Sequence, residues 1–162
     1  MNTRASSSKS SGGPPRRSRS PLEDLIKCFC GACESFFKRK HIIQALKANE
    51  YEVLSDNELR KILKKFIEFR QGGSYIKPPI MEIVECYELS ESILAMEEDL
   101  EERRADIDDL CFTEDWEDRL AAAIDDGTTD DFFNELMIEC SRRLGEEPEY
   151  TMFKEELRKK LK

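Results

Sequence analysis

The sequence predicts an all-α fold, a compact irregular bundle of six or seven helices preceded by a disordered basic N-terminal arm. After residue 20, apolar residues recur at intervals of three and four, the spacing of one buried helix face. Short stretches containing Gly or Pro separate these segments, as is typical of loops between helices. No segment shows a convincing alternation of apolar and polar residues, so no strand is predicted.

Residues 1–20 are predicted to form the disordered arm. Apart from Met1 they contain no large apolar side chain, so burial cannot offset the entropy that ordering would cost. The arm is basic, and phosphorylation of serines among its arginines would cancel most of its positive charge. The arginines are Arg16, Arg17 and Arg19, and the candidate phosphorylation sites are Ser18 and Ser20.

Residues 21–162 are predicted to form a single helical domain whose first part, residues 21–71, is basic. Apolar residues at helical spacing predict a helix over about residues 21–39. The stretch 42–48 either adds a short helix or continues the first one.

A capping box at Ser55–Glu58 predicts the start of the next helix, and Gly72–Gly73 predicts its end. The polar face of this helix carries a cluster of bases, which includes Lys61, Lys64 and Lys65.

Acidic helices are predicted over residues 80–145, after the loop that contains Pro78–Pro79. The apolar register slips near Ser90 and Ser92, which predicts either a kink or two abutting helices. A short C-terminal helix is expected over residues 150–161. The boundary residues expected for the two helices before it are Thr113 and Gly127, and Thr128 or Thr129 and Gly145.

Charge is distributed unevenly along the chain. Residues 1–77 hold sixteen Lys/Arg against eight Asp/Glu, whereas residues 78–147 hold five against twenty-four. Such asymmetry governs encounter and partner choice rather than fold. The boundary near Lys77 falls in a predicted loop, so the two parts can pack as neighbours and neutralise part of the asymmetry internally.

Three cysteines and the only histidine lie near the start of the domain. Three thiolates and one imidazole fit a Cys₃His zinc site, but cysteines two residues apart on a helix point about 200° apart, which disfavours a shared ion. The cysteines also fit two other roles, as small core side chains or as acylation sites beside the basic run Lys38–Lys40. The zinc candidates are Cys28, Cys30, Cys33 and His41, and no cofactor is predicted.

The chain has six cysteines and no export signal, which predicts reduced thiols and a cytoplasmic or nuclear location. Because no nucleophile elbow, phosphate loop, dinucleotide fingerprint or His-Glu metal motif is present, no enzymatic activity is expected.

The expected function is that of a non-catalytic intracellular adaptor or regulator that binds another protein with a basic surface. No small-molecule substrate is expected. A viral accessory protein and a fast-evolving eukaryotic regulator both fit this description. The predicted partner surface is an acidic face with Glu97, Glu98, Glu101, Glu102, Asp108, Asp109 and Asp115.

Two alternatives use the basic part of the chain. The arm arginines and the Lys61–Lys65 face fit a nucleic-acid-associated regulator, although no recognised nucleic-acid-binding signature is present. Acylation at Cys28–Cys33 would instead make a peripheral membrane protein.

Overall fold

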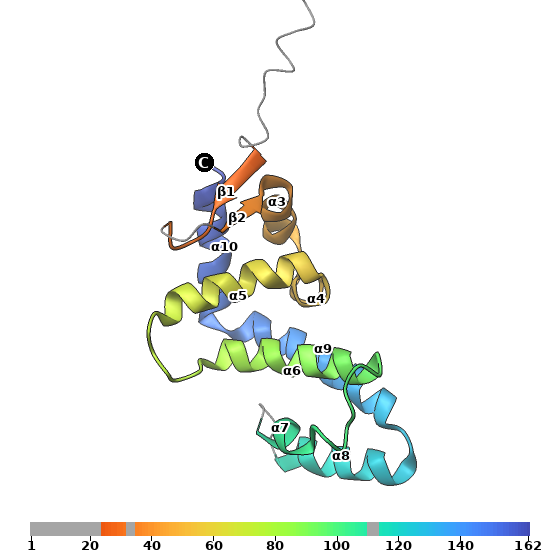
Figure 1. Ribbon diagram of the computed structural model, residues 1–162. Helices are drawn as coiled ribbons and strands as arrows, with labels where there is room; N and C mark the ends of the chain where they lie inside the picture. The colour runs from red at the N-terminus through yellow and green to blue at the C-terminus, as the bar shows by residue number, and fades with distance from the viewer. Residues whose placement is uncertain (1–23, 32–34, 110–113) are drawn as a thin grey trace, which may run out of the picture.

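The computed structural model describes residues 24–31, 35–109 and 114–162, and within them it contains eight α-helices and one two-stranded β-sheet (Figure 1). The predicted mostly helical, compact fold is confirmed. The elements are β1 (Leu25–Lys27), β2 (Phe36–Lys38), α3 (Arg39–Lys47), α4 (Glu50–Ser55), α5 (Asn57–Gln71), α6 (Pro79–Leu94), α7 (Arg104–Asp108), α8 (Glu114–Asp126), α9 (Thr129–Glu146) and α10 (Pro148–Lys160).

Several sequence predictions lie outside the described residues. They concern the basic arm with its candidate contact and phosphorylation sites, one zinc candidate, one helix cap and one acidic side chain. These are Arg16, Arg17, Ser18, Arg19, Ser20, Cys33, Thr113 and the side chain of Asp108.

The predicted helix over residues 21–39 is wrong for the described residues, which form an antiparallel hairpin. β1 pairs with β2 in the register Ile26↔Phe37, and the Cys28 amide donates to the Ser35 carbonyl at 3.1 Å. Gly31 has φ 67°, a left-handed conformation that interrupts any helix. The helix-like spacing arose because apolar side chains of the hairpin also point towards a core, and tertiary packing overrode the local pattern.

Aromatic contacts attach the hairpin to the helices. The ring centroid of Phe29 lies 5.6 Å from that of Phe37, 5.3 Å from that of Phe66 on α5 and 6.4 Å from that of Phe153 on α10. Phe66 and Phe153 are fully buried. Because such pairs add to the free energy of area burial, this cluster fixes the hairpin between two helices that are distant in sequence.

The elements are stacked in successive tiers (Figure 1). The hairpin, α3 and α10 occupy one end, α4 and α5 follow, α6 and α9 lie next to them, and α7 and α8 occupy the opposite end. One continuous apolar core runs through these tiers from Ile42 to Leu157. The basic N-terminal elements and the acidic lobe-forming elements α7 and α8 therefore lie at opposite ends of the stack.

The helix boundaries agree only partly with the predicted signals. Gly72 and Gly127 adopt φ values of 61° and 72° and follow α5 and α8, as predicted. Asp56, not Ser55, caps α5, because its Oδ1 accepts from the amides of Glu58 and Leu59 at 2.9 and 3.1 Å. The capping box lies one helix earlier, where the side chains of Asn49 and Glu52 each accept from the other residue's amide.

Gly145 does not end its helix, contrary to prediction. α9 continues to Glu146 and stops before Pro148, whose ring disfavours a helical conformation of the preceding residue. A Cβ at position 145 would lie 2.9 Å from Oε1 of Glu50 on α4. The glycine thus leaves room for the flexible side chain of Glu50 to lie against α9.

The predicted kink or pair of abutting helices near Ser90 and Ser92 is not found, because α6 runs through both residues and residues 95–103 separate it from α7. α6 ends at Leu94, and Met96 follows with φ 60°. The amides of Glu97 and Glu98 then both donate to the Ser92 carbonyl, at 2.9 and 3.3 Å. These bonds turn the chain away from the α6 axis towards α7.

A buried guanidinium joins the basic helix α5 to the acidic helix α6. Arg60 is only 8% exposed, and its Nη1 donates to the Leu54 carbonyl at 2.5 Å. Its Nε lies 3.1 Å from Glu88 Oε2 and its Nη2 lies 3.2 Å from Glu91 Oε1. Lys64 Nζ also contacts Glu88, at 3.0 Å. Part of the charge asymmetry is therefore neutralised inside the fold.

α10 holds the N-terminal tier through a lysine. Lys154 Nζ donates to the carbonyls of Ala45, Leu46 and Ala48 at 2.7, 3.1 and 2.6 Å, where the C-terminus of α3 leaves carbonyls without intrahelical partners. Burial lowers the pKa of Lys154, although Glu50 opposes this effect. The cation compensates for the partial negative charge of the helix end.

We expect Arg60→Ala to lower the free energy of unfolding by about 2 kcal/mol, because it removes the donor to the Leu54 carbonyl and to Glu91 and leaves Glu88 with Lys64 alone. Urea unfolding followed by circular dichroism at 222 nm measures this change. Arg70→Ala, at an exposed position on the same helix, is the matched control and should change stability by less than about 0.5 kcal/mol. Equal losses in the two variants would contradict the role given to Arg60.

A second expectation concerns acid stability. Hydrogen bonds from Arg142 and then Arg143 lower the pKa of Glu139 to about 2, against desolvation. Because the folded-state pKa lies below the unfolded one, the stabilisation is complete above about pH 4.5 and is lost as the pH falls towards 2. Glu139→Gln should therefore be less stable than the parent chain at pH 7 and equally stable near pH 2, as measured by denaturant unfolding at each pH.

Candidate functional site

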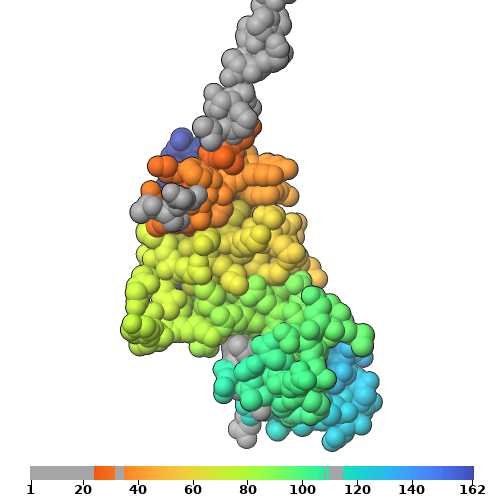
Figure 2. Space-filling view, in the orientation of Figure 1, coloured from red at the N-terminus to blue at the C-terminus, as the bar shows by residue number. Residues whose placement is uncertain are grey.

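The acidic lobe, defined as residues 95–109 and 114–126, forms the end of the molecule opposite the hairpin (Figure 2). It carries fourteen Asp/Glu against three Lys/Arg. Trp116 and Phe132 anchor it to α9, with ring centroids 5.8 Å apart in an edge-to-face arrangement. The acidic side chains of the lobe therefore project from elements that are packed against α9.

Arg103 organises the charged surface of the lobe. Its Nη1 lies 2.8 Å from Glu98 Oε1 in the loop before α7, and its Nε lies 2.7 Å from Asp106 Oδ2 within α7. These two carboxylates raise the pKa of Arg103, with the hydrogen bond to Asp106 as the largest cause. The guanidinium therefore fixes the loop relative to the short helix.

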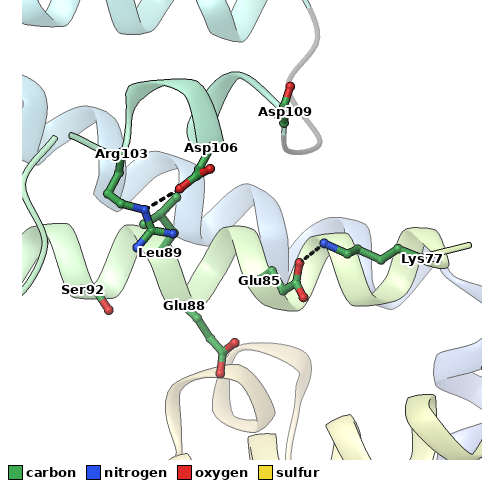
Figure 3. A pocket seen from close by; sticks show the side chains of 8 residues that line it. All are labelled: Lys77, Glu85, Glu88, Leu89, Ser92, Arg103, Asp106 and Asp109. Carbon is green, nitrogen blue, oxygen red and sulfur yellow. Dashed lines mark hydrogen bonds and ion pairs between the residues drawn. The ribbon is translucent and has the colours of Figure 1, made fainter. Parts of the chain in front are cut away.

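An acidic groove of about 480 Å³ lies between α6 and α7 (Figure 3). In the figure, Lys77 reaches Glu85 at one end, at 2.5 Å, and Arg103 reaches Asp106 at the other. Glu88 points away from Arg103, in keeping with its ion pairs to α5. The full lining is Lys77, Glu85, Glu88, Leu89, Ser92, Arg103, Asp106 and Asp109.

The structure distributes the predicted partner-binding acids over this lobe. Of these, Asp109 lines the groove, and Glu98 is held by Arg103. Four of the others whose side chains are described are exposed, and none of the four forms an ion pair with another described residue. These four are Glu97, Glu101, Glu102 and Asp115.

A second groove, of about 490 Å³ and referred to below as the basic groove, lies between β2 and α5 at the end of the molecule that carries the hairpin. Phe37 and Ile62 belong to its apolar surface, and Phe36 is 48% exposed beside them. Four lysines and two glutamates supply most of its charge. The full lining is Ser35, Phe36, Phe37, Lys38, His41, Glu58, Lys61, Ile62, Lys64, Lys65 and Glu68.

The predicted basic face is only partly available within this groove. Lys64 is committed to Glu88 of α6, whereas Lys61 and Lys65 are more exposed, with contacts to Glu58 at 3.7 Å and Glu68 at 3.8 Å. Such exposed pairs contribute little to stability. Lys61 and Lys65 can therefore exchange their intrahelical partners for a ligand at small cost.

The zinc candidates are not brought together among the described residues. No group of three or more His, Cys, Asp or Glu side chains that could hold a metal ion occurs in residues 24–31, 35–109 and 114–162. Cys28 is 3% exposed, Cys30 is exposed, and His41 instead lines the basic groove, with its Nδ1 4.0 Å from Glu58 Oε2. Cys86 and Cys140 are buried core residues.

Sequence reasoning missed the contributions of α6 and β2 to the two grooves. Glu85 and Glu88 belong to an apolar-patterned helix and gave no signal beyond their charge. Phe36 and Lys38 were assigned to a helix, which concealed that they lie on a strand beside α5. The residues Phe36, Phe37 and Lys38 show no alternation of apolar and polar types, so the sequence contained no local signal for this strand.

The chain was compared with protein families, curated proteins and solved structures, and no family, curated protein or solved structure matches it. Within the described residues, no helix combines the length and the apolar character required to cross a membrane.

Arg103→Ala should release the loop before α7, because it removes both ion pairs at once. Hydrogen–deuterium exchange should then be faster for amides of residues 97–109 and unchanged for α5. Arg142→Ala on α9, which also loses two ion pairs, serves as the control and should leave residues 97–109 unchanged. Identical exchange in Arg103→Ala and the parent chain would show that the pairs do not hold the loop.

Proposed function

We propose that the protein is a non-catalytic binding module whose acidic lobe receives a basic segment of another protein. The observation that carries this proposal is the set of exposed carboxylates at Glu97, Glu101, Glu102 and Asp115, which form no ion pair with another described residue and belong to the lobe that also contributes to the acidic groove. A surface of one sign attracts the opposite charge over distance and accelerates association.

The arrangement of the lobe supports binding of a basic partner rather than a role limited to repelling other acidic molecules. Carboxylates in the groove walls are already paired, as Glu85 is with Lys77 and Asp106 is with Arg103. The acids beyond these pairs are available to a partner, and the groove offers room for a side chain such as arginine beside Asp109. Arginine forms bidentate bonds with carboxylates, so a basic segment rich in arginine fits best.

The two alternatives have weaker support. A nucleic-acid site would require lysines free to contact phosphates, but Lys64 is bound to Glu88, and Glu58 and Glu68 lie among the remaining bases. Of the acylation candidates, Cys30 is exposed, but modification of Cys28 would require opening of the hairpin, since that residue is 3% exposed. We therefore place the function with protein recognition, in a cytoplasmic or nuclear setting.

The test is a charge reversal on the lobe. Glu101→Lys/Glu102→Lys should weaken binding of a synthetic twelve-residue Arg/Lys-rich peptide by about tenfold at physiological salt, because two attractive contacts become repulsive. Isothermal titration calorimetry or fluorescence anisotropy measures the dissociation constant.

Glu155→Lys/Glu156→Lys on α10 is the control, because it changes the net charge by the same amount at the other end of the molecule. It should alter the dissociation constant by less than about twofold. If both variants weaken binding equally, only net charge matters and the acidic lobe is not the site.

A further inference from the structure

The basic groove lies along β2, and the edge of β2 that faces away from β1 pairs with no other strand among the described residues. The Cys28 amide donates to the Ser35 carbonyl, so these two residues form a hydrogen-bonded pair of the hairpin. Because such pairs alternate along an antiparallel ladder, Ile26 and Phe37 form the next one. The backbone groups of Phe36 and Lys38 therefore point away from β1. Lys38 is also the N-cap of α3, so its carbonyl accepts within the first helical turn, and its amide and both backbone groups of Phe36 are what this edge offers.

The groove takes its strand residues from β2 and none from β1. Ser35, Phe36, Phe37 and Lys38 all line it, and α5 forms the opposite wall. An extended segment of another chain placed here meets backbone donors and acceptors on one side and the side chains of α5 on the other.

The side chains around this edge select the chemistry of such a segment. Lys61 is 71% exposed and Lys65 48% exposed, and among the described residues each forms an ion pair with a glutamate of its own helix, at 3.7 and 3.8 Å. Phe36, 48% exposed, offers an apolar surface between these bases and the strand edge. The groove therefore complements a segment in which acidic and apolar side chains alternate.

We propose that this groove binds an extended acidic segment of a partner protein, which adds to the hairpin as a third strand beside β2. The backbone of Phe36 and the amide of Lys38 supply main-chain hydrogen bonds, and Lys61 and Lys65 receive the acidic side chains. Apolar side chains on the other face of the segment lie against Phe36. This site is separate from the acidic lobe, so the two proposals stand or fall independently.

A polypeptide fits this groove better than a polynucleotide does. Glu58 and Glu68 lie in the lining and would repel successive phosphates, whereas they tolerate a peptide that carries charge only on alternate residues. The open edge of β2 adds a second preference, because main-chain hydrogen bonding in register is available only to another strand.

The first test measures fluorescence anisotropy of a labelled ten-residue peptide of alternating Glu and Val. Lys61→Glu should raise its dissociation constant at least fivefold. Lys159→Glu is the matched control, because Lys159 is 68% exposed and also contacts a glutamate three residues earlier, at 3.1 Å. The control should change binding by less than twofold, and equal effects of the two substitutions would overturn the proposal.

A second pair of variants tests the apolar contact. Phe36→Ser should weaken peptide binding at least threefold, whereas Phe69→Ser, which removes a phenylalanine of 46% exposure outside the groove, should not. Circular dichroism shows whether either variant unfolds. Because Lys61→Glu changes no residue of the hairpin, it tests peptide binding by the groove even if Phe36→Ser does not fold.

The strand geometry is tested with peptides that are N-methylated on alternate residues. Methylation of the residues that face β2 should abolish binding, and methylation in the other register should preserve it. Equal binding of both peptides would exclude strand addition. If sedimentation shows self-association that Lys61→Glu abolishes, the groove binds a second copy of this chain. If single-stranded RNA or anionic vesicles bind more tightly than the peptide and also depend on Lys61, the groove binds those ligands. Each of these results would overturn the proposal.

Discussion

The fold depends on one buried cation, the guanidinium of Arg60, which connects three segments. It donates to the last turn of α4 through the Leu54 carbonyl and contacts Glu88 and Glu91 of α6. A buried charge of this kind is tolerable only when its donors are satisfied, so the positions of α4, α5 and α6 are mutually constrained. The same contact joins the basic part of the sequence to the acidic part.

The internal ion pairs determine which charges remain for partners. Arg60 and Lys64 are consumed by α6, so the basic end exposes chiefly Lys61 and Lys65 beside β2. At the opposite end the acids outnumber the bases so strongly that most cannot be paired. The elongated stack keeps these two surfaces apart (Figure 1), which allows each to bind a partner of opposite sign without competition from the other.

The two ends also differ in how they are held. Phe29, Phe66 and Phe153 pack the hairpin on α5 and α10, and Lys154 closes the end of α3. The acidic lobe relies on the Trp116–Phe132 contact and on the ion pairs of Arg103. A partner that binds the lobe therefore contacts a surface organised largely by charge, whereas a partner in the basic groove contacts one fixed by aromatic packing.

The sequence by itself determined the helical class, the helix ends at Gly72 and Gly127, and the separation of charge along the chain. These features follow from local rules: apolar spacing, the conformational freedom of glycine, and the count of charged residues. Only the tertiary structure decided that the first segment is a hairpin, that α9 continues through Gly145 with the Glu50 side chain beside it, and that Lys64 faces Glu88 while Lys61 does not. Each of these outcomes depends on a partner far away in sequence, and a local pattern that fits both a helix and a hairpin contains no information about which distant side chain it will meet.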